Sequence, residues 1–199
     1  MRIHSSSAAT LALVSALALP GLAWAQAGTF TGGVGVIYVQ PHVDSPVLGA
    51  HVSNDTQPVL DLNYYFTNHI ALATQLALPR HEVSVGGVSL GKVTLAPFNL
   101  VLQYHFMPEQ KFSPYLGAGI NYTLFFDQGG TLSNFERFGP STGGVLQAGA
   151  DYNLNQKDFI NFDVKKWYIE TDITPKGGAK IETMKLDPVT LSVAFGMHF

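Results

Sequence analysis

The chain has 199 residues, of which 46% are hydrophobic and only 13% charged, and its formal net charge is −3 with neutral histidines. It contains no cysteine, which excludes disulfides, thiolate metal sites and a cysteine nucleophile. It also has none of the basic clusters that are typical of nucleic-acid-binding proteins, and its length fits one domain.

The first 25 residues predict a secretory signal peptide. Arg2 precedes an apolar run from Ala8 to Leu19, and the triplet Ala23-Trp24-Ala25 suits cleavage after Ala25. The apolar run is shorter than the roughly 20 residues that a membrane helix needs. We therefore expect residues 1–25 to be removed and residues 26–199 to form one exported domain. A buried N-terminal helix is the alternative interpretation.

Beyond the signal, apolar residues recur at every second position, as in the final stretch "VTLSVAFGMHF". This period of two is typical of strands with two different faces. The segments that carry it lie near residues 29–40, 57–67, 69–79, 92–107, 112–126, 141–154, 159–173 and 185–199. Lipid offers no partner for backbone polar groups, so only helices and closed barrels cross a membrane. The pattern predicts an all-β fold, an eight-stranded antiparallel transmembrane β-barrel.

The connections between these segments alternate in length. Short turns are expected at 67–68, 108–111 and 155–158, and long loops at 41–56, 80–91, 127–140 and 174–184. Short periplasmic turns opposite long extracellular loops are typical of barrels in the outer membrane of Gram-negative bacteria. The first segment, "TFTGGVGVIYVQP", is rich in glycine, and its alternation does not define which residues face outward.

A lipocalin-like soluble barrel is the main structural alternative, because it also has eight antiparallel strands with an apolar face inside. The composition of the two faces favours the membrane barrel. The polar faces, which suit a lumen, include Asp61, Asn63, Asn121, Asp151, Asn161 and Asp163. The apolar faces end in rings that we expect to form interfacial girdles, namely Tyr64, Phe66, Tyr104, Phe106, Phe125, Phe126 and Phe159.

The stretches "LNYYFTNHIALATQLALPRHEV", "KFSPYLGAGINYTLFFD" and "KLDPVTLSVAFGMHF" resemble the OmpW/AlkL family of outer-membrane proteins, in the order and spacing of that family. The resemblance covers nearly the whole mature chain. It implies an apolar passage that admits small hydrophobic molecules and releases them sideways into the membrane. The partners it implies are hydrophobic solutes, outer-membrane lipids and lipopolysaccharide, and the outer-membrane assembly machinery. No cofactor is implied.

Four residues are candidates for the passage and its wall. Trp167 shares the expected lumen phase of Asp163 and Lys165, and the resemblance places it in the hydrophobic passage, although it could simply fill the lumen. Gln75 falls where the passage of the family is apolar. Pro79 ends one strand and Pro97 lies inside the next, so the wall between them lacks two ladder donors. This favours a lateral opening there, with ordinary strand termination as the alternative.

The alternating end of the chain, with Phe195, Met197 and the terminal Phe199, resembles the signal that the outer-membrane assembly machinery reads. The histidines show no metal-ligand spacing, and neither catalytic nor cofactor-binding residues are predicted. Transport of apolar solutes is thus the leading function. The alternatives are a structural or adhesion barrel that acts through its extracellular loops and, third, a lipid-modifying enzyme.

Overall fold

The computed structural model describes residues 27–126, 129–134, 140–175 and 177–199. The predicted signal peptide and its cleavage site lie outside the described residues. Within the described part, no helix is long and apolar enough to cross a membrane. The elements are β1 (Phe30–Gln40), β2 (Ala50–Val52), β3 (Asp55–Tyr65), β4 (Ile70–Leu76), β5 (Arg80–Val85), β6 (Val88–His105), β7 (Phe112–Phe126), the 3-10 helix η1 (Gly130–Asn134), β8 (Ser141–Asn153), β9 (Asp158–Trp167), β10 (Glu170–Ile173), β11 (Glu182–Lys185) and β12 (Val189–His198).

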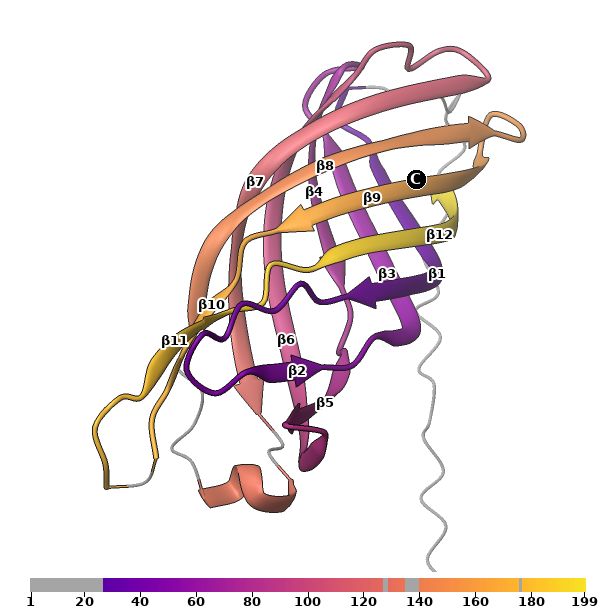
Figure 1. Ribbon diagram of the computed structural model, residues 1–199. Coiled ribbons are helices and arrows are strands. Elements are labelled where there is room, and N and C mark those ends of the chain that lie inside the picture. Colours follow the sequence, from indigo (N-terminus) through magenta and orange to yellow (C-terminus); the bar gives the residue numbers. More distant parts are fainter. Residues whose placement is uncertain (1–26, 127–128, 135–139, 176) are drawn as a thin grey trace, which may run out of the picture.

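Eight of these strands close into a barrel. The order is β6-β4-β3-β1-β12-β9-β8-β7, and β7 pairs again with β6, with every pair antiparallel. The predicted eight-stranded barrel is therefore confirmed (Figure 1). The short turns and the end of β12 lie at one end of the barrel, which corresponds to the periplasmic side. Strands β2, β5, β10 and β11 and helix η1 extend the opposite, extracellular end.

The predicted long loop at 80–91 is wrong, because these residues form β5 and the first part of β6. The two strands are joined by Gly86 and Gly87, which have φ angles of 56° and 80°. Two consecutive residues with positive φ make the tight hairpin turn whose twist matches that of its strands. The predicted strand at 69–79 is correspondingly too long, since β4 ends at Leu76.

The last two predicted strands are each interrupted in the structure. The segment 159–173 divides into β9 and β10, and β12 begins at Val189 instead of residue 185. Pro188, which has no N–H to donate, and Asp187, with a φ of 26°, form the interruption before β12. The predicted loops at 41–56 and 174–184 contain the short strands β2 and β11.

Apolar and polar side chains lie on the outer and inner faces of the barrel wall, respectively, as predicted for a membrane protein. Large apolar side chains such as Leu62, Leu102 and Ile120 are exposed on the outer face. The polar residues expected in the lumen all point inward, namely Asp61, Asn63, Asn121, Asp151, Asn161 and Asp163. The lipocalin-like alternative, which requires the apolar face inside, is therefore wrong.

Two of the rings predicted for the outer girdle lie inside the barrel. Phe125 and Phe159 are buried, whereas Phe126 is exposed. Adjacent strand residues point to opposite faces, so only one ring of the pair Phe125-Phe126 can face lipid. Phe159 lies against Gly196, where a Cβ atom would come within 2.3 Å of the ring.

The structure also explains the unclear pattern of the first strand. Thr31, Ile37 and Val39 are buried on the inner face of β1. Between them stands Gly35, where a Cβ atom would lie 2.1 Å from the backbone oxygen of Val193 on β12. Glycine is needed at this position because the neighbouring strand comes so close, and the alternation of side chains is therefore interrupted.

Candidate functional site: an apolar cavity above a polar plug

The outer half of the barrel contains an apolar cavity with a volume of about 740 Å³, including the open space at its mouth. Aliphatic, proline and aromatic side chains make up most of its lining, contributed by the barrel strands and by β2, β5, β10 and β11. Several of these side chains belong to the main hydrophobic core of the molecule. A mostly apolar lining with a few polar groups is typical of small-molecule sites.

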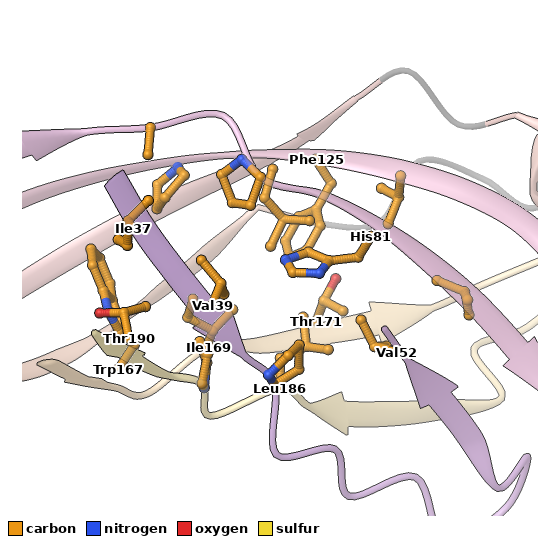
Figure 2. Close-up of a pocket in the computed structure, with 18 of the residues that line it drawn as sticks. Ile37, Val39, Val52, His81, Phe125, Trp167, Ile169, Thr171, Leu186 and Thr190 are labelled. Carbon is orange, nitrogen blue, oxygen red and sulfur yellow. The ribbon is translucent and has the colours of Figure 1, made fainter. Parts of the chain in front are cut away.

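Trp167 lines this cavity at the end of β9, and its side chain is only 4% exposed. The indole Nε1–H donates a hydrogen bond to Oγ1 of Thr190 on β12, at 3.1 Å. This bond fixes the plane of the ring, and Figure 2 shows the two residues together at one side of the cavity. The predicted inward phase of Trp167 is confirmed by its burial, and its role in a passage stays a prediction.

On the periplasmic side of this cavity, hydrogen-bonded polar side chains fill the lumen. We call this group the polar plug; it consists of Gln103, Tyr115, Gln147, Asp151, Asn161, Asp163 and Lys165. Asn161 donates to the Tyr115 hydroxyl at 2.8 Å and to Asp151 at 2.7 Å, and Gln103 donates to Gln147 at 3.1 Å. An eight-stranded barrel is narrow enough for side chains to fill it, so the plug closes the direct route to the periplasm.

Asp163 is the centre of the plug. Its Oδ1 atom lies 2.6 Å from Nζ of Lys165, and both side chains are buried. The other oxygen, Oδ2, accepts hydrogen bonds from the Tyr115 hydroxyl at 2.8 Å and from Nε2 of Gln147 at 2.5 Å. A buried charge is tolerated only when it is paired and hydrogen-bonded, and here both conditions hold.

The boundary between plug and cavity passes through Gln75, which lines both. Its Nε2 atom donates to Asp61 at 2.8 Å, while its Oε1 atom is enclosed without a hydrogen-bond partner among the described residues. On β9 two successive inward-facing residues lie on either side of this boundary: Lys165 belongs to the plug and Trp167 lines the cavity. Gln75 and Trp167 therefore mark the floor of the apolar cavity.

Beside the cavity, two neighbouring strands of the barrel wall are incompletely paired by backbone hydrogen bonds. Strands β4 and β6 pair from Ile70↔Tyr104 to Ala73↔Val101, and the ladder ends there. The next backbone hydrogen bond between the two segments runs from Leu95 N to Pro79 O, at 2.9 Å. We call the stretch between these points, residues 74–78 and 96–100, the β4–β6 seam.

Side chains replace part of the missing ladder. Nδ2 of Asn99 donates to the backbone oxygen of Gln75 at 2.9 Å, within the seam. Pro97, within the seam, and Pro79, directly next to it, are the two prolines singled out from the sequence, and both line the apolar cavity. Neither can donate a backbone hydrogen bond, which agrees with a wall that is incompletely paired here. The importance of Asn99 was not evident from the sequence, because its partner is a backbone atom of another strand.

The extracellular end is held together by a buried carboxylate. Glu182 on β11 accepts hydrogen bonds from Oγ of Ser45 at 2.5 Å and from the backbone N–H of Val47 at 2.9 Å. The segment between β1 and β2 is thereby attached to the β10–β11 hairpin. Among the described residues, no group of three or more acidic or histidine side chains could hold a metal ion.

The comparisons with known proteins agree with this architecture. The model of the OmpW family matches residues 34–199. An outer-membrane protein of Sinorhizobium fredii, y4mB, is 40% identical over 148 residues, which are 70% of this chain and 64% of that protein. Outer membrane protein W of Vibrio cholerae is 34% identical over 212 residues, covering 95% of this chain and 97% of the relative.

A more distant relative is the dibenzothiophene metabolism operon protein PahQ of Pseudomonas aeruginosa, 27% identical over 88% of this chain and 91% of its own length. Among solved structures, the outer membrane protein OprG of Pseudomonas aeruginosa superposes with a TM-score of 0.75 at 27% identity. The superposition covers 87% of this chain and 97% of OprG. Outer membrane protein W of Escherichia coli gives a TM-score of 0.65 at 31% identity, covering 87% and 99% of the two chains.

Proposed function

Because the chain belongs to the OmpW family and is an outer-membrane β-barrel, we propose that it lets small hydrophobic molecules enter the cell envelope passively. A solute enters the apolar cavity from the extracellular end. It then leaves sideways through the β4–β6 seam into the membrane. The observation that carries this proposal is the position of the apolar cavity. The polar plug closes it on the periplasmic side, and the incompletely paired β4–β6 seam bounds it on one side.

The energetics of the two exits support the lateral route. A solute that continued down the lumen would have to separate hydrogen bonds around Asp163 and leave buried polar groups without partners. Each such group costs roughly 1–3 kcal/mol, and more when it is charged. At the seam the solute has to displace the side-chain hydrogen bond from Asn99 to the Gln75 carbonyl, but the β4–β6 ladder has already ended at Ala73↔Val101.

The comparison with PahQ also favours an apolar solute. That relative is a dibenzothiophene metabolism operon protein by name, and dibenzothiophene is an aromatic hydrophobic molecule. The cavity of the present chain has an apolar lining that suits such a molecule, and this lining includes the rings of Trp167 and Phe125. We therefore place aromatic and aliphatic hydrophobic molecules in one candidate class of solute.

Replacing Trp167 tests the proposed use of the cavity. We expect Trp167→Ala to weaken solute binding about five- to thirty-fold, because it removes apolar contact worth about 1–2 kcal/mol. Solute uptake into proteoliposomes should fall with binding, whereas the heat-dependent gel migration of the folded barrel should persist. Trp167→Phe, which keeps an aromatic ring and loses the bond to Thr190, should retain most of the uptake. Unchanged uptake with every apolar solute in Trp167→Ala would contradict the proposal.

We also propose that the final strand carries the assembly signal. The ring of Phe199 is 49% exposed on the outer face of the barrel, beside the outward Phe195 and Met197 of β12. We expect Phe199→Ala to lower the amount of folded barrel in the outer membrane several-fold, measured by heat-dependent migration of membrane fractions. The matched control is Phe66→Ala, since Phe66 is 52% exposed at the same end of the barrel. Equal losses in both variants would remove the special role of Phe199.

A further inference from the structure

One polar side chain in the apolar cavity is not explained by the architecture. His81 on β5 is only 2% exposed, and its ring lines the cavity on the extracellular side of the floor formed by Gln75 and Trp167. Figure 2 shows the imidazole between Phe125 and Thr171. A histidine among apolar side chains is costly unless its polar atoms are used, so the partner of each ring nitrogen decides its function.

The first ring nitrogen has a clear partner. Nδ1 of His81 lies 2.6 Å from the backbone oxygen of Ser53, and a carbonyl oxygen can only accept, so Nδ1 carries the proton. Ser53 is itself fixed against β5, because Glu82 N donates to its Oγ and its N–H donates to the Glu82 oxygen, both at 2.9 Å. The imidazole is therefore held in one orientation and one tautomer.

The second ring nitrogen has no such partner. Within residues 27–126, 129–134, 140–175 and 177–199, no hydrogen bond to Nε2 of His81 is found. Nε2 is not one of the enclosed polar atoms that lack a partner, so part of its surface is open to the cavity. In a neutral imidazole protonated at Nδ1, Nε2 is a hydrogen-bond acceptor. A buried acceptor with access only to an apolar cavity needs a donor from whatever enters that cavity.

The charge state of the ring agrees with this assignment. Arg80 and Glu82, the outward-facing neighbours of His81, are charged and exposed, so this part of β5 lies outside the membrane. Burial lowers the pKa of His81 below its ordinary value, against smaller opposing effects of the Ser53 carbonyl and Asp55. The imidazole is therefore neutral near pH 7 and accepts at Nε2, where an imidazolium would only donate.

We propose that the cavity prefers apolar molecules that carry one hydroxyl group, such as alkanols and phenols, and that Nε2 of His81 accepts the hydrogen bond of that hydroxyl. The apolar body of the molecule then extends from His81 toward the floor at Trp167. Near the floor, the side-chain hydroxyl of Thr190 already accepts a hydrogen bond from the Trp167 indole. This inference rests on the proposed function, because it requires solutes to enter the cavity.

Three probes of similar size isolate the hydrogen bond. 1-Octanol has the donor, its isomer 1-methoxyheptane has the same atoms without a donor, and octane has no polar atom. Binding is measured by fluorescence of the full mature barrel in lipid nanodiscs, where Trp167 is the only tryptophan once residues 1–25 are removed. The ratio of the octanol to the ether affinity is compared between the wild type and variants, so that partitioning of each probe into lipid cancels.

The key variant is His81→Asn, because the asparagine amide can still donate to Ser53 O and lacks an acceptor at the position of Nε2. We expect the octanol-to-ether ratio to be roughly three- to ten-fold higher in the wild type than in His81→Asn, the effect of one neutral hydrogen bond. His81→Phe serves as a second variant and should give the same low ratio. The control His51→Asn alters an exposed histidine on β2 and should keep the wild-type ratio.

The outcomes separate the two proposals. Equal ratios in the wild type, His81→Asn and His81→Phe, with all three probes still binding, would overturn the role of His81 and leave solute binding intact. Failure of all three probes to change the emission of Trp167 in the wild type would overturn the use of the cavity itself. If His51→Asn lowered the octanol-to-ether ratio as much as His81→Asn does, the assignment of the hydrogen bond to His81 would also be contradicted.

Discussion

Closing the β4–β6 seam with a covalent bond is expected to abolish uptake of apolar solutes. The chain has no cysteine, so the double variant Leu76→Cys/Phe98→Cys would contain only the two introduced thiols. These residues face outward on either side of the seam, and they would be opposite each other if the register Ala73↔Val101 continued. A disulfide requires Cα atoms about 4.4–6.8 Å apart, so its formation draws the two strands into contact.

The measurement is solute uptake by proteoliposomes before oxidation, after oxidation and after reduction of the same sample. We expect uptake to be lost on oxidation and to return on reduction, with the loss of free thiols reporting closure. The control Leu72→Cys/Leu102→Cys places the disulfide at a register pair where the same two strands are already hydrogen-bonded. Oxidation of this variant should leave uptake unchanged. Full uptake by the oxidised Leu76→Cys/Phe98→Cys barrel would exclude the seam as the exit.

Removing the carboxylate at the centre of the polar plug is expected to destabilise the barrel by about 3–5 kcal/mol. Asp163→Ala leaves the ammonium of Lys165 buried without its counter-ion and also removes the acceptor of Tyr115 and Gln147. The free energy of unfolding can be measured by urea titration of the barrel in lipid bilayers. A mutation at an exposed surface position would change it by less than about 0.5 kcal/mol.

The double variant Asp163→Ala/Lys165→Met distinguishes the unpaired charge from general loss of packing. Replacing both members of a buried ion pair is often neutral or even stabilising, because neither charge then remains to be desolvated. We therefore expect the double variant to recover the part of the lost stability that is due to the unpaired ammonium of Lys165, while the donors of Tyr115 and Gln147 stay unpaired. If Lys165→Met merely added its own loss to that of Asp163→Ala, the two residues would not be energetically coupled and this account of the plug would be wrong.

The alternation of side chains predicts the barrel and the contents of its lumen, because both follow from local geometry. Strand β12 alternates over its whole length, and every one of its outward and inward positions agrees with the prediction. The same reasoning places Trp167 inside with Asp163 and Lys165. Local patterns fail where adjacent residues are similar, as with Phe125 and Phe126, whose opposite directions the alternation rule should have separated.

The site itself depends on contacts between distant parts of the chain, which a periodic pattern does not contain. The orientation of His81 depends on the backbone of Ser53, 28 residues away in sequence, and Asn99 bonds the backbone of Gln75 across the seam. The seam is a place where pairing stops, and the two prolines were its only sign in the sequence. The β5–β6 hairpin had a local signal in Gly86-Gly87, which predicts a tight turn.

The charged residues at the two ends of the apolar outer face determine how deeply the barrel is immersed. Glu82 and Lys92, opposite each other on β5 and β6, are exposed at the extracellular end, and Lys111 and Lys157 are exposed at the other. Moving a lysine to the bilayer midplane costs about 2–4 kcal/mol, so the barrel cannot slide far along the membrane normal. The β4–β6 seam lies directly below the upper charges. A solute leaving through it would therefore enter the outer leaflet and would still have to cross the inner leaflet by its own diffusion.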